Sequence, residues 1–141
     1  APTLSNPDKF FKSYRLLSSA INSGIVNTAH DCSEGGLGVT LAEMCIGGRI
    51  GATIDIDGTG DCPLFSKLWG ESLGRIVVTV SPDNDAKFLE AMSGSTTTYI
   101  GIVDDSDKLN ISDGFDPIIT MNVSDMVQSW QGTLDMSGGE L

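Results

Sequence analysis

Apolar residues recur along this chain at helical and strand spacings in alternation, which restricts its fold more than any other feature. In the first segment they are spaced by four, three and four residues, which predicts an amphipathic helix from the cap at residues 5–8 to about residue 24. Its apolar positions are Phe10, Tyr14, Leu17 and Ile21. Further helices are expected over residues 37–48, 63–69, 81–92 and 123–130, and strands over 25–29, 52–56, 75–80, 96–103 and 117–121.

This order of elements indicates the fold class. Helices and strands alternate and then strands cluster, so we expect helices packed on a sheet, either α/β or α+β. The strand over 25–29 is β-branched and is expected to be buried, and an acidic run at 104–107 is expected to turn the chain into residues 108–112. No internal repeat or linker divides the chain. We therefore expect one domain over residues 1–134, with a flexible tail at 135–141 and fraying from about Gly132.

The charge excludes several partners. The chain has 8 Lys and Arg against 19 Asp and Glu, a formal net charge of −11. A polyanion binder needs a basic footprint, so nucleic acid and anionic membranes are poor candidates. An apolar share of 40% is too high for a disordered acidic tail, and no stretch approaches the length of a membrane span. Most of the excess acid lies after residue 75.

The cysteines indicate a cellular compartment, and the first residue bears on whether the sequence is part of a longer chain. Three irregularly spaced cysteines suit reduced thiols in a cytoplasmic protein better than a disulfide framework. No n-region and h-region pattern opens the sequence, so a secretion signal is not expected. Because the first residue is Ala1, we expect either a processed chain or a fragment of a longer one.

The densest polar cluster is His30-Asp31-Cys32-Ser33-Glu34-Gly35-Gly36, between an expected strand and an expected helix. Asp31 offers the hard oxygen ligand that Mg²⁺ uses beside a nucleotide phosphate. Ser33 can cap the helix or donate to a phosphate, while Gly35 and Gly36 allow backbone N–H groups to approach an anion. The alternative is a capping serine and a Gly-Gly turn beside an ordinary loop acid.

A second candidate is the segment that contains Glu71, Ser72 and Arg75, which could orient a phosphate or a ribose. Its alternative is that Ser72 caps, that Glu71 pairs with Arg75, and that nothing binds.

Other signals are weaker. Residues 55–61 resemble the opening of a calcium loop, but its twelfth position is Ser66, which argues against an EF-hand. His30 could be a general base, although a hydrogen-bonded scaffold role is favoured. A zinc site lacks paired cysteine spacing; its members would be His30, Cys32, Cys45 and Cys62. Four methionines are expected to fill the core: Met44, Met92, Met121 and Met126.

The cluster at 30–37 is followed by Leu41-Ala42-Glu43-Met44, by Gly51-Ala52-Thr53-Ile54-Asp55-Ile56 and by Gly70-Glu71-Ser72-Leu73-Gly74-Arg75. Together with Ser129-Trp130-Gln131-Gly132-Thr133-Leu134, these motifs resemble the C-terminal domain of the phosphoribosylformylglycinamidine synthase family. That family, also called formylglycinamide ribonucleotide amidotransferase, belongs to the aminoimidazole ribonucleotide synthetase-like superfamily. The resemblance covers about residues 10–134 and implies an α+β fold, a mixed sheet with helices packed on it.

The resemblance also implies a function. The family amidates formylglycinamide ribonucleotide in purine synthesis, using ATP, Mg²⁺ and glutamine-derived ammonia. Asp31 is similar to a Mg²⁺ ligand, whereas Ser33, Gly35 and Gly36 correspond to nucleotide contacts. The family commonly has Asp at position 34 and a hydrophobic residue at position 32. Its catalytic histidine and most of its ATP contacts lie in domains absent from this sequence.

These absences imply partners and leave alternatives open. The implied partners are the N-terminal domains of the same enzyme, a glutaminase subunit or domain, and a small bridging subunit. The nucleotide, ATP or ADP, is either consumed or structural, and the isolated domain is expected to be inactive. The alternatives are a non-catalytic scaffold domain, or another ATP-using synthetase or kinase of the superfamily.

Overall fold

The computed structural model describes residues 6–132, which divide into two compact units. The first unit is built from the segments up to residue 40 and from 68 to 99, and the second from residues 41–67 and from residue 100 onward. Each unit has its own β-sheet, and helices accompany both. The expected α+β class is therefore confirmed, and the expected tail at 135–141 lies outside the described residues.

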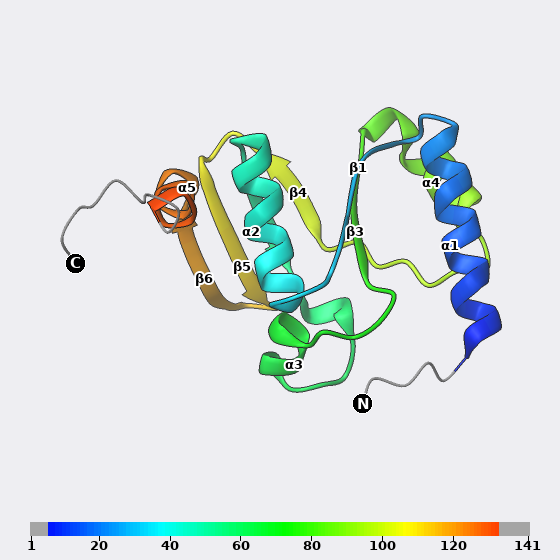
Figure 1. The fold of residues 1–141 in the computed structure, drawn as a ribbon, viewed down its shortest axis with the longest axis horizontal. Coiled ribbons are helices and arrows are strands. Elements are labelled where there is room, and N and C mark those ends of the chain that lie inside the picture. The colour runs from blue at the N-terminus through cyan, green and yellow to red at the C-terminus, as the bar shows by residue number, and fades with distance from the viewer. Residues whose placement is uncertain (1–5, 133–141) are drawn as a thin grey trace. The chain divides into compact units, whose positions relative to one another are not determined.

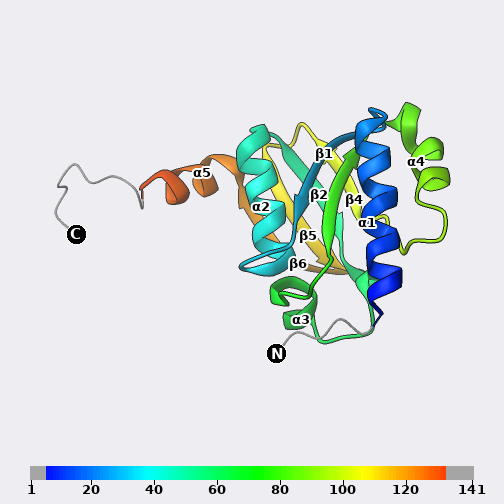
Figure 2. The same ribbon diagram turned by 45° about the vertical axis from the view of Figure 1, so that its right-hand side comes forward.

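The first unit places two helices against a pair of antiparallel strands. Helix α1 (Pro7–Asn22) leads to strand β1 (Val26–Asp31), which pairs with β3 (Ile76–Val80). A 3₁₀ turn (Pro82–Asn84) then leads into α4 (Asp85–Ala91). Both helices lie on the same side of the strand pair (Figures 1 and 2). They enclose a core with the strands, whose most buried members are Leu17, Ala20, Phe88 and Met92.

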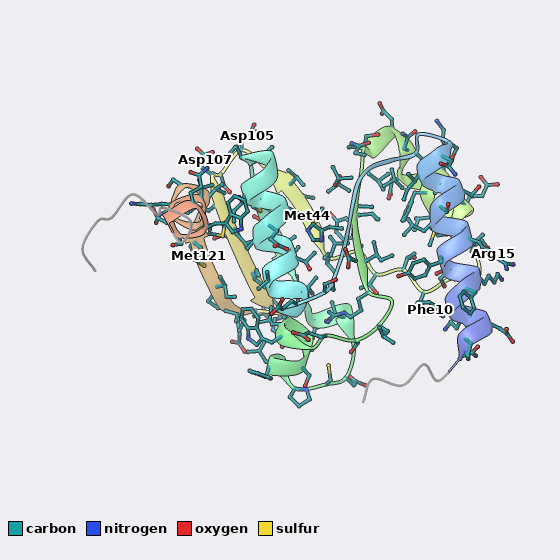
Figure 3. The ribbon with its side chains drawn as sticks, viewed as in Figure 1. Phe10, Arg15, Met44, Asp105, Asp107 and Met121 are labelled. Carbon is teal, nitrogen blue, oxygen red and sulfur yellow. The ribbon has the colours of Figure 1, made fainter. Side chains whose placement is uncertain are left out.

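The start of α1 is as expected, but its buried face is rotated. The Asn6 Oδ1 atom accepts a hydrogen bond from the Lys9 N–H at 3.0 Å, and Pro7 occupies the first helical position. The expected stripe included Tyr14 and Ile21, yet both are exposed. The core contacts of α1 come instead from Leu17 and Ala20, with Leu16 packed beside them. Figure 3 shows Phe10 and Arg15 on different sides of this helix.

The second unit contains a four-stranded mixed sheet of order β4-β2-β5-β6. Strand β2 (Gly51–Asp55) runs antiparallel to β4 (Gly101–Asp104) and parallel to β5 (Lys108–Asp113). Strand β6 (Asp116–Asn122) pairs antiparallel with β5. Asp105 and Asp107 lie at the turn between β4 and β5 (Figure 3).

Three helices and one 3₁₀ turn complete the part of the chain that the structure describes. Helix α2 (Gly36–Gly48) begins in the first unit and ends in the second, whereas α3 (Leu64–Trp69) crosses in the other direction. A 3₁₀ turn (Asp57–Thr59) follows β2, and α5 (Val123–Gly132) follows β6. The buried residues Val123, Met126 and Val127 recur at the three-to-four spacing of one helical face.

Several expectations about individual segments were wrong. Strand β1 is mostly exposed, because its sheet has only two strands and the helices cover one face. The strand expected over 96–103 begins only at Gly101, since pairing with β2 starts there. Met121 on β6 is 45% exposed, and Met44 is only half-buried, whereas the other two methionines are buried.

Within residues 6–132, no helix combines the length and the apolar character that crossing a membrane requires.

Candidate functional site

Strand pairing in the first unit brings the two candidate segments together. Asp31, the last residue of β1, is the register partner of Ile76, the first residue of β3. The next backbone N–H, of Cys32, donates to the Arg75 carbonyl at 2.9 Å. Residues 32–35, which lead into α2, therefore lie beside residues 70–75, which lead into β3.

Asp31 and Ser33 form a hydrogen-bonded pair at the end of β1. The Ser33 hydroxyl donates to the Asp31 carboxylate, so it does not cap α2, which begins three residues later. This hydrogen bond lowers the pKa of Asp31 below its ordinary value, because it stabilises the charged form. The Asp31 side chain is exposed, so an ionised carboxylate faces solvent.

Glu71 ties the two segments together. Its Oε1 atom accepts a hydrogen bond from the Gly35 N–H at 3.0 Å, across 36 residues of sequence. The neighbouring Gly36 N–H donates to the Ser33 carbonyl at 3.0 Å. Both backbone donors that the sequence assigned to an anion are thus used within the protein.

Gly36 is required where it stands. Its φ is +62°, and a Cβ atom there would lie 2.7 Å from the Leu68 carbonyl oxygen. At Gly38 a Cβ atom would meet the Trp69 ring at 2.6 Å. The first turn of α2 therefore packs directly on residues 68–70, which fixes where the Glu71 backbone lies.

Sequence reasoning missed Thr40 and Trp69. The Thr40 side chain is 1% exposed, and its hydroxyl lies 2.9 Å from the Gly36 carbonyl and 3.2 Å from the Asp31 carbonyl. Thr40 therefore links the end of β1 to the first turn of α2. A polar residue within an otherwise apolar helix was the available signal for Thr40, but nothing in the sequence indicated that Trp69 covers Gly38.

The remaining candidates of this region have structural contacts. The Arg75 guanidinium donates to the Gly70 carbonyl at 3.3 Å and so braces the turn before β3. Ser72 is exposed in the same turn. The His30 Nδ1 atom is 2.8 Å from the Asp31 carbonyl oxygen, which can only accept, so this nitrogen carries the proton. That contact fits the favoured scaffold role of His30.

The calcium-loop and zinc candidates of the sequence differ in their contacts and in their burial. The Asp55 carboxylate accepts from the N–H groups of Asp57 and Gly114 at 3.0 and 2.9 Å, which lowers its pKa and joins the end of β2 to the β5–β6 turn. Cys32 and Cys45 are buried and Cys62 is exposed. Among residues 6–132, no group of three or more His, Cys, Asp or Glu side chains could hold a metal ion by itself.

The family is decided by a match over most of the sequence. A family model described as the C-terminal domain of AIR synthase related proteins matches residues 3–114. The chain belongs to this family. The AIR synthase-like domain is 40% identical over 107 residues to the phosphoribosylformylglycinamidine synthase subunit PurL of Lactobacillus acidophilus. That match covers 74% of this chain and 13% of the relative, so the chain spans only a small part of the relative's length.

Solved structures support the same fold. The AIR synthase-like domain matches phosphoribosylformylglycinamidine synthase II of Thermotoga maritima with a TM-score of 0.76 and 19% identity, over 89% of this chain and 22% of that one. The T. maritima protein in complex with ATP matches with a TM-score of 0.71 and 20% identity, over 80% and 20% of the two chains. Its complex with FGAR matches with a TM-score of 0.75 and 20% identity, over 88% of this chain and 22% of that one.

Proposed function

We propose that this AIR synthase-like domain is the C-terminal part of a longer phosphoribosylformylglycinamidine synthase. The observation that carries the proposal is the 40% identity to the L. acidophilus PurL subunit. The reaction would amidate formylglycinamide ribonucleotide with ATP, Mg²⁺ and glutamine-derived ammonia. The catalytic histidine and the other domains would come from the rest of the chain, and a glutaminase and a small bridging subunit would be partners.

The residues at the end of β1 fit a nucleotide and a magnesium ion shared with its phosphates. Mg²⁺ is usually held by one or two carboxylates together with phosphate oxygens, so a single exposed carboxylate suffices. Asp31 supplies that carboxylate, and Ser33 keeps it ionised. When bound, the ion would offset the negative charge of the phosphates. Ser33, Gly35 and Gly36 would contact the nucleotide, and Ser72 and Arg75, in the segment that also holds Glu71, would contact substrate or phosphate.

Nucleotide binding by the intact protein tests this role of Asp31. We expect Asp31→Asn to weaken Mg-ADP binding by at least about tenfold in calorimetry. Asp83→Asn, which removes an exposed acid before α4, serves as the control and should leave the affinity unchanged. Loss of amidation together with loss of binding would indicate a consumed nucleotide, whereas loss of binding alone would indicate a structural one.

The isolated chain should not turn over, because half of each composite site would be missing. Steady ATP hydrolysis by residues 1–141 with substrate and ammonia would contradict the proposal.

The contact between Gly35 and Glu71 favours a second candidate. Since both glycine N–H groups are already bonded within the protein, this domain could act as a scaffold that docks against its neighbours. In that case Asp31→Asn would leave nucleotide occupancy of the intact protein unchanged.

A further inference from the structure

The N-terminus of α2 already holds an anion, and this anion comes from the protein. Glu71 places a carboxylate oxygen 3.0 Å from the Gly35 nitrogen, directly before the first residue of a 13-residue helix. The first turn of α2 has no acidic residue of its own. A carboxylate at this position is favourable, because it meets the positive end of the helix and an N–H group that the helix leaves unbonded.

A nucleotide phosphate at this loop would compete for the same donor. The Gly35 N–H has one hydrogen, which it gives to Glu71, and the Gly36 N–H is given to the Ser33 carbonyl. Asp31 and Glu34 are exposed nearby in sequence and add negative charge to that of Glu71. A phosphate without a cation would therefore meet both a missing donor and like charges.

We propose that Glu71 is an internal substitute for phosphate, which an incoming nucleotide must displace from Gly35. The inference rests on the proposed nucleotide role of this loop and adds its regulation. Glu71 sets the affinity of the site and makes it selective for a phosphate that arrives with Mg²⁺, because only the metal-bound phosphate carries reduced charge.

Displacement requires only a side-chain rotation. The backbone before Glu71 is fixed, because residues 68–70 pack on Gly36 and Gly38, and because Arg75 donates to the Gly70 carbonyl. The Glu71 side chain is exposed, so it can turn into solvent without opening a buried surface. The cost of binding is then the loss of one charge-assisted hydrogen bond.

The test uses the intact protein that contains this chain, with three variants. Glu71→Ala removes the carboxylate, Glu71→Gln keeps an acceptor without the charge, and Glu34→Gln removes the exposed charge of the residue next to Gly35. We expect Glu71→Ala to tighten ADP binding without Mg²⁺ by about tenfold. Glu71→Gln should have a smaller effect in the same direction, Glu34→Gln the smallest, and Mg-ADP should respond less than ADP in every case.

Amide hydrogen exchange of the peptide that covers residues 33–37 provides a readout independent of nucleotide. Without ligand, Glu71→Ala should speed exchange at Gly35 relative to wild type and to Glu34→Gln. Equal or weaker ADP binding by Glu71→Ala, in a protein whose wild type binds ADP, would overturn the inference and leave the proposed function standing. Absence of nucleotide binding in wild type and variants alike would overturn both.

Discussion

At the scale of single residues, the Asp31–Ser33 pair determines how readily the Asp31 carboxylate ionises. The Ser33 hydroxyl stabilises the Asp31 carboxylate, and His30 contributes a smaller attraction. The carboxylate therefore stays ionised at lower pH than an ordinary aspartate. A metal-bound nucleotide would meet an ionised ligand over the whole physiological range.

This pair predicts a specific pH dependence. We expect the pKa of Asp31, followed by carboxyl-carbon NMR, to lie below the ordinary 3.8 in the native chain and to rise in Ser33→Ala. Because the folded pKa is depressed, the contribution of Asp31 to stability is present above the unfolded pKa and is lost as the pH falls through the folded pKa. Ser72→Ala is the control, and an equal shift in both variants would contradict this role of Ser33.

Sequence reasoning at this scale could select candidate positions but could not predict their contacts. Asp31 and Ser33 could be chosen because their residue types and their place before a helix suit a phosphate and a metal. The contact of Glu71 with Gly35 could not be predicted, because it depends on the register of β1 with β3. The expectation that Glu71 would pair with Arg75 considered only neighbours along the chain.

At the scale of elements, the first turn of α2 depends on close backbone approach. Gly36 and Gly114 share a φ of +62°, but only Gly36 has neighbours within reach of a Cβ atom. The two positions therefore separate the cost of the backbone conformation from the cost of the contact with residues 68–70.

This difference predicts the effect of two alanine substitutions. Gly114→Ala should reduce the free energy of unfolding by about 1–2 kcal/mol, the cost of the left-handed conformation. Gly36→Ala should reduce it by about 2–5 kcal/mol, because the overlap with the Leu68 carbonyl adds to that cost. Urea unfolding of both variants measures the difference, and equal values would contradict the close approach.

The mixed sheet offers a second matched comparison. Ile111 on the central strand β5 is 2% exposed, whereas Ile102 on the edge strand β4 is 56% exposed. We expect Ile111→Ala to cost about 2–5 kcal/mol of unfolding free energy. Ile102→Ala should cost less than about 1 kcal/mol. Similar losses in urea unfolding would mean that β4 is covered in solution.

Elements were predicted well where the apolar periodicity agreed with capping and turn residues. They were predicted poorly where pairing with another strand sets the bounds or the burial. Helix α1 has both a capping Asn6 and a proline, and its expected start is confirmed. The run of threonines at 96–98 favours a strand by propensity, yet pairing with β2 begins only at Gly101. The prediction that β1 is buried was wrong for a related reason. The strand has one partner and one covered face, which leaves most of it exposed.

At the scale of the whole molecule, most of the excess acid belongs to one unit. Residues 6–40 and 68–99 contain five basic and seven acidic side chains, a net charge of −2, and the remaining net charge of −9 belongs to the second unit. Repulsion among these charges opposes the compact state.

This distribution predicts a stabilising effect of salt. Raising NaCl from low concentration to about 0.5 M should raise the melting temperature, because screening weakens repulsion between exposed carboxylates. The double variant Asp105→Asn and Asp116→Asn, which neutralises two exposed acids of the second unit, should respond less. A melting temperature that falls with salt in both proteins would show that attraction between charges dominates.

The interleaving of the two units has a consequence for synthesis on the ribosome. The first unit is interrupted by residues 41–67, so β1 emerges long before β3, to which it pairs through Val26 and Val80. The second unit likewise waits for β4, β5 and β6 after β2 has emerged. Translation at roughly 5–20 residues per second leaves β1 without its partner for a few seconds. During that interval its β-branched residues are a ready target for chaperones, and a pause in translation near residue 67 would prolong the exposure.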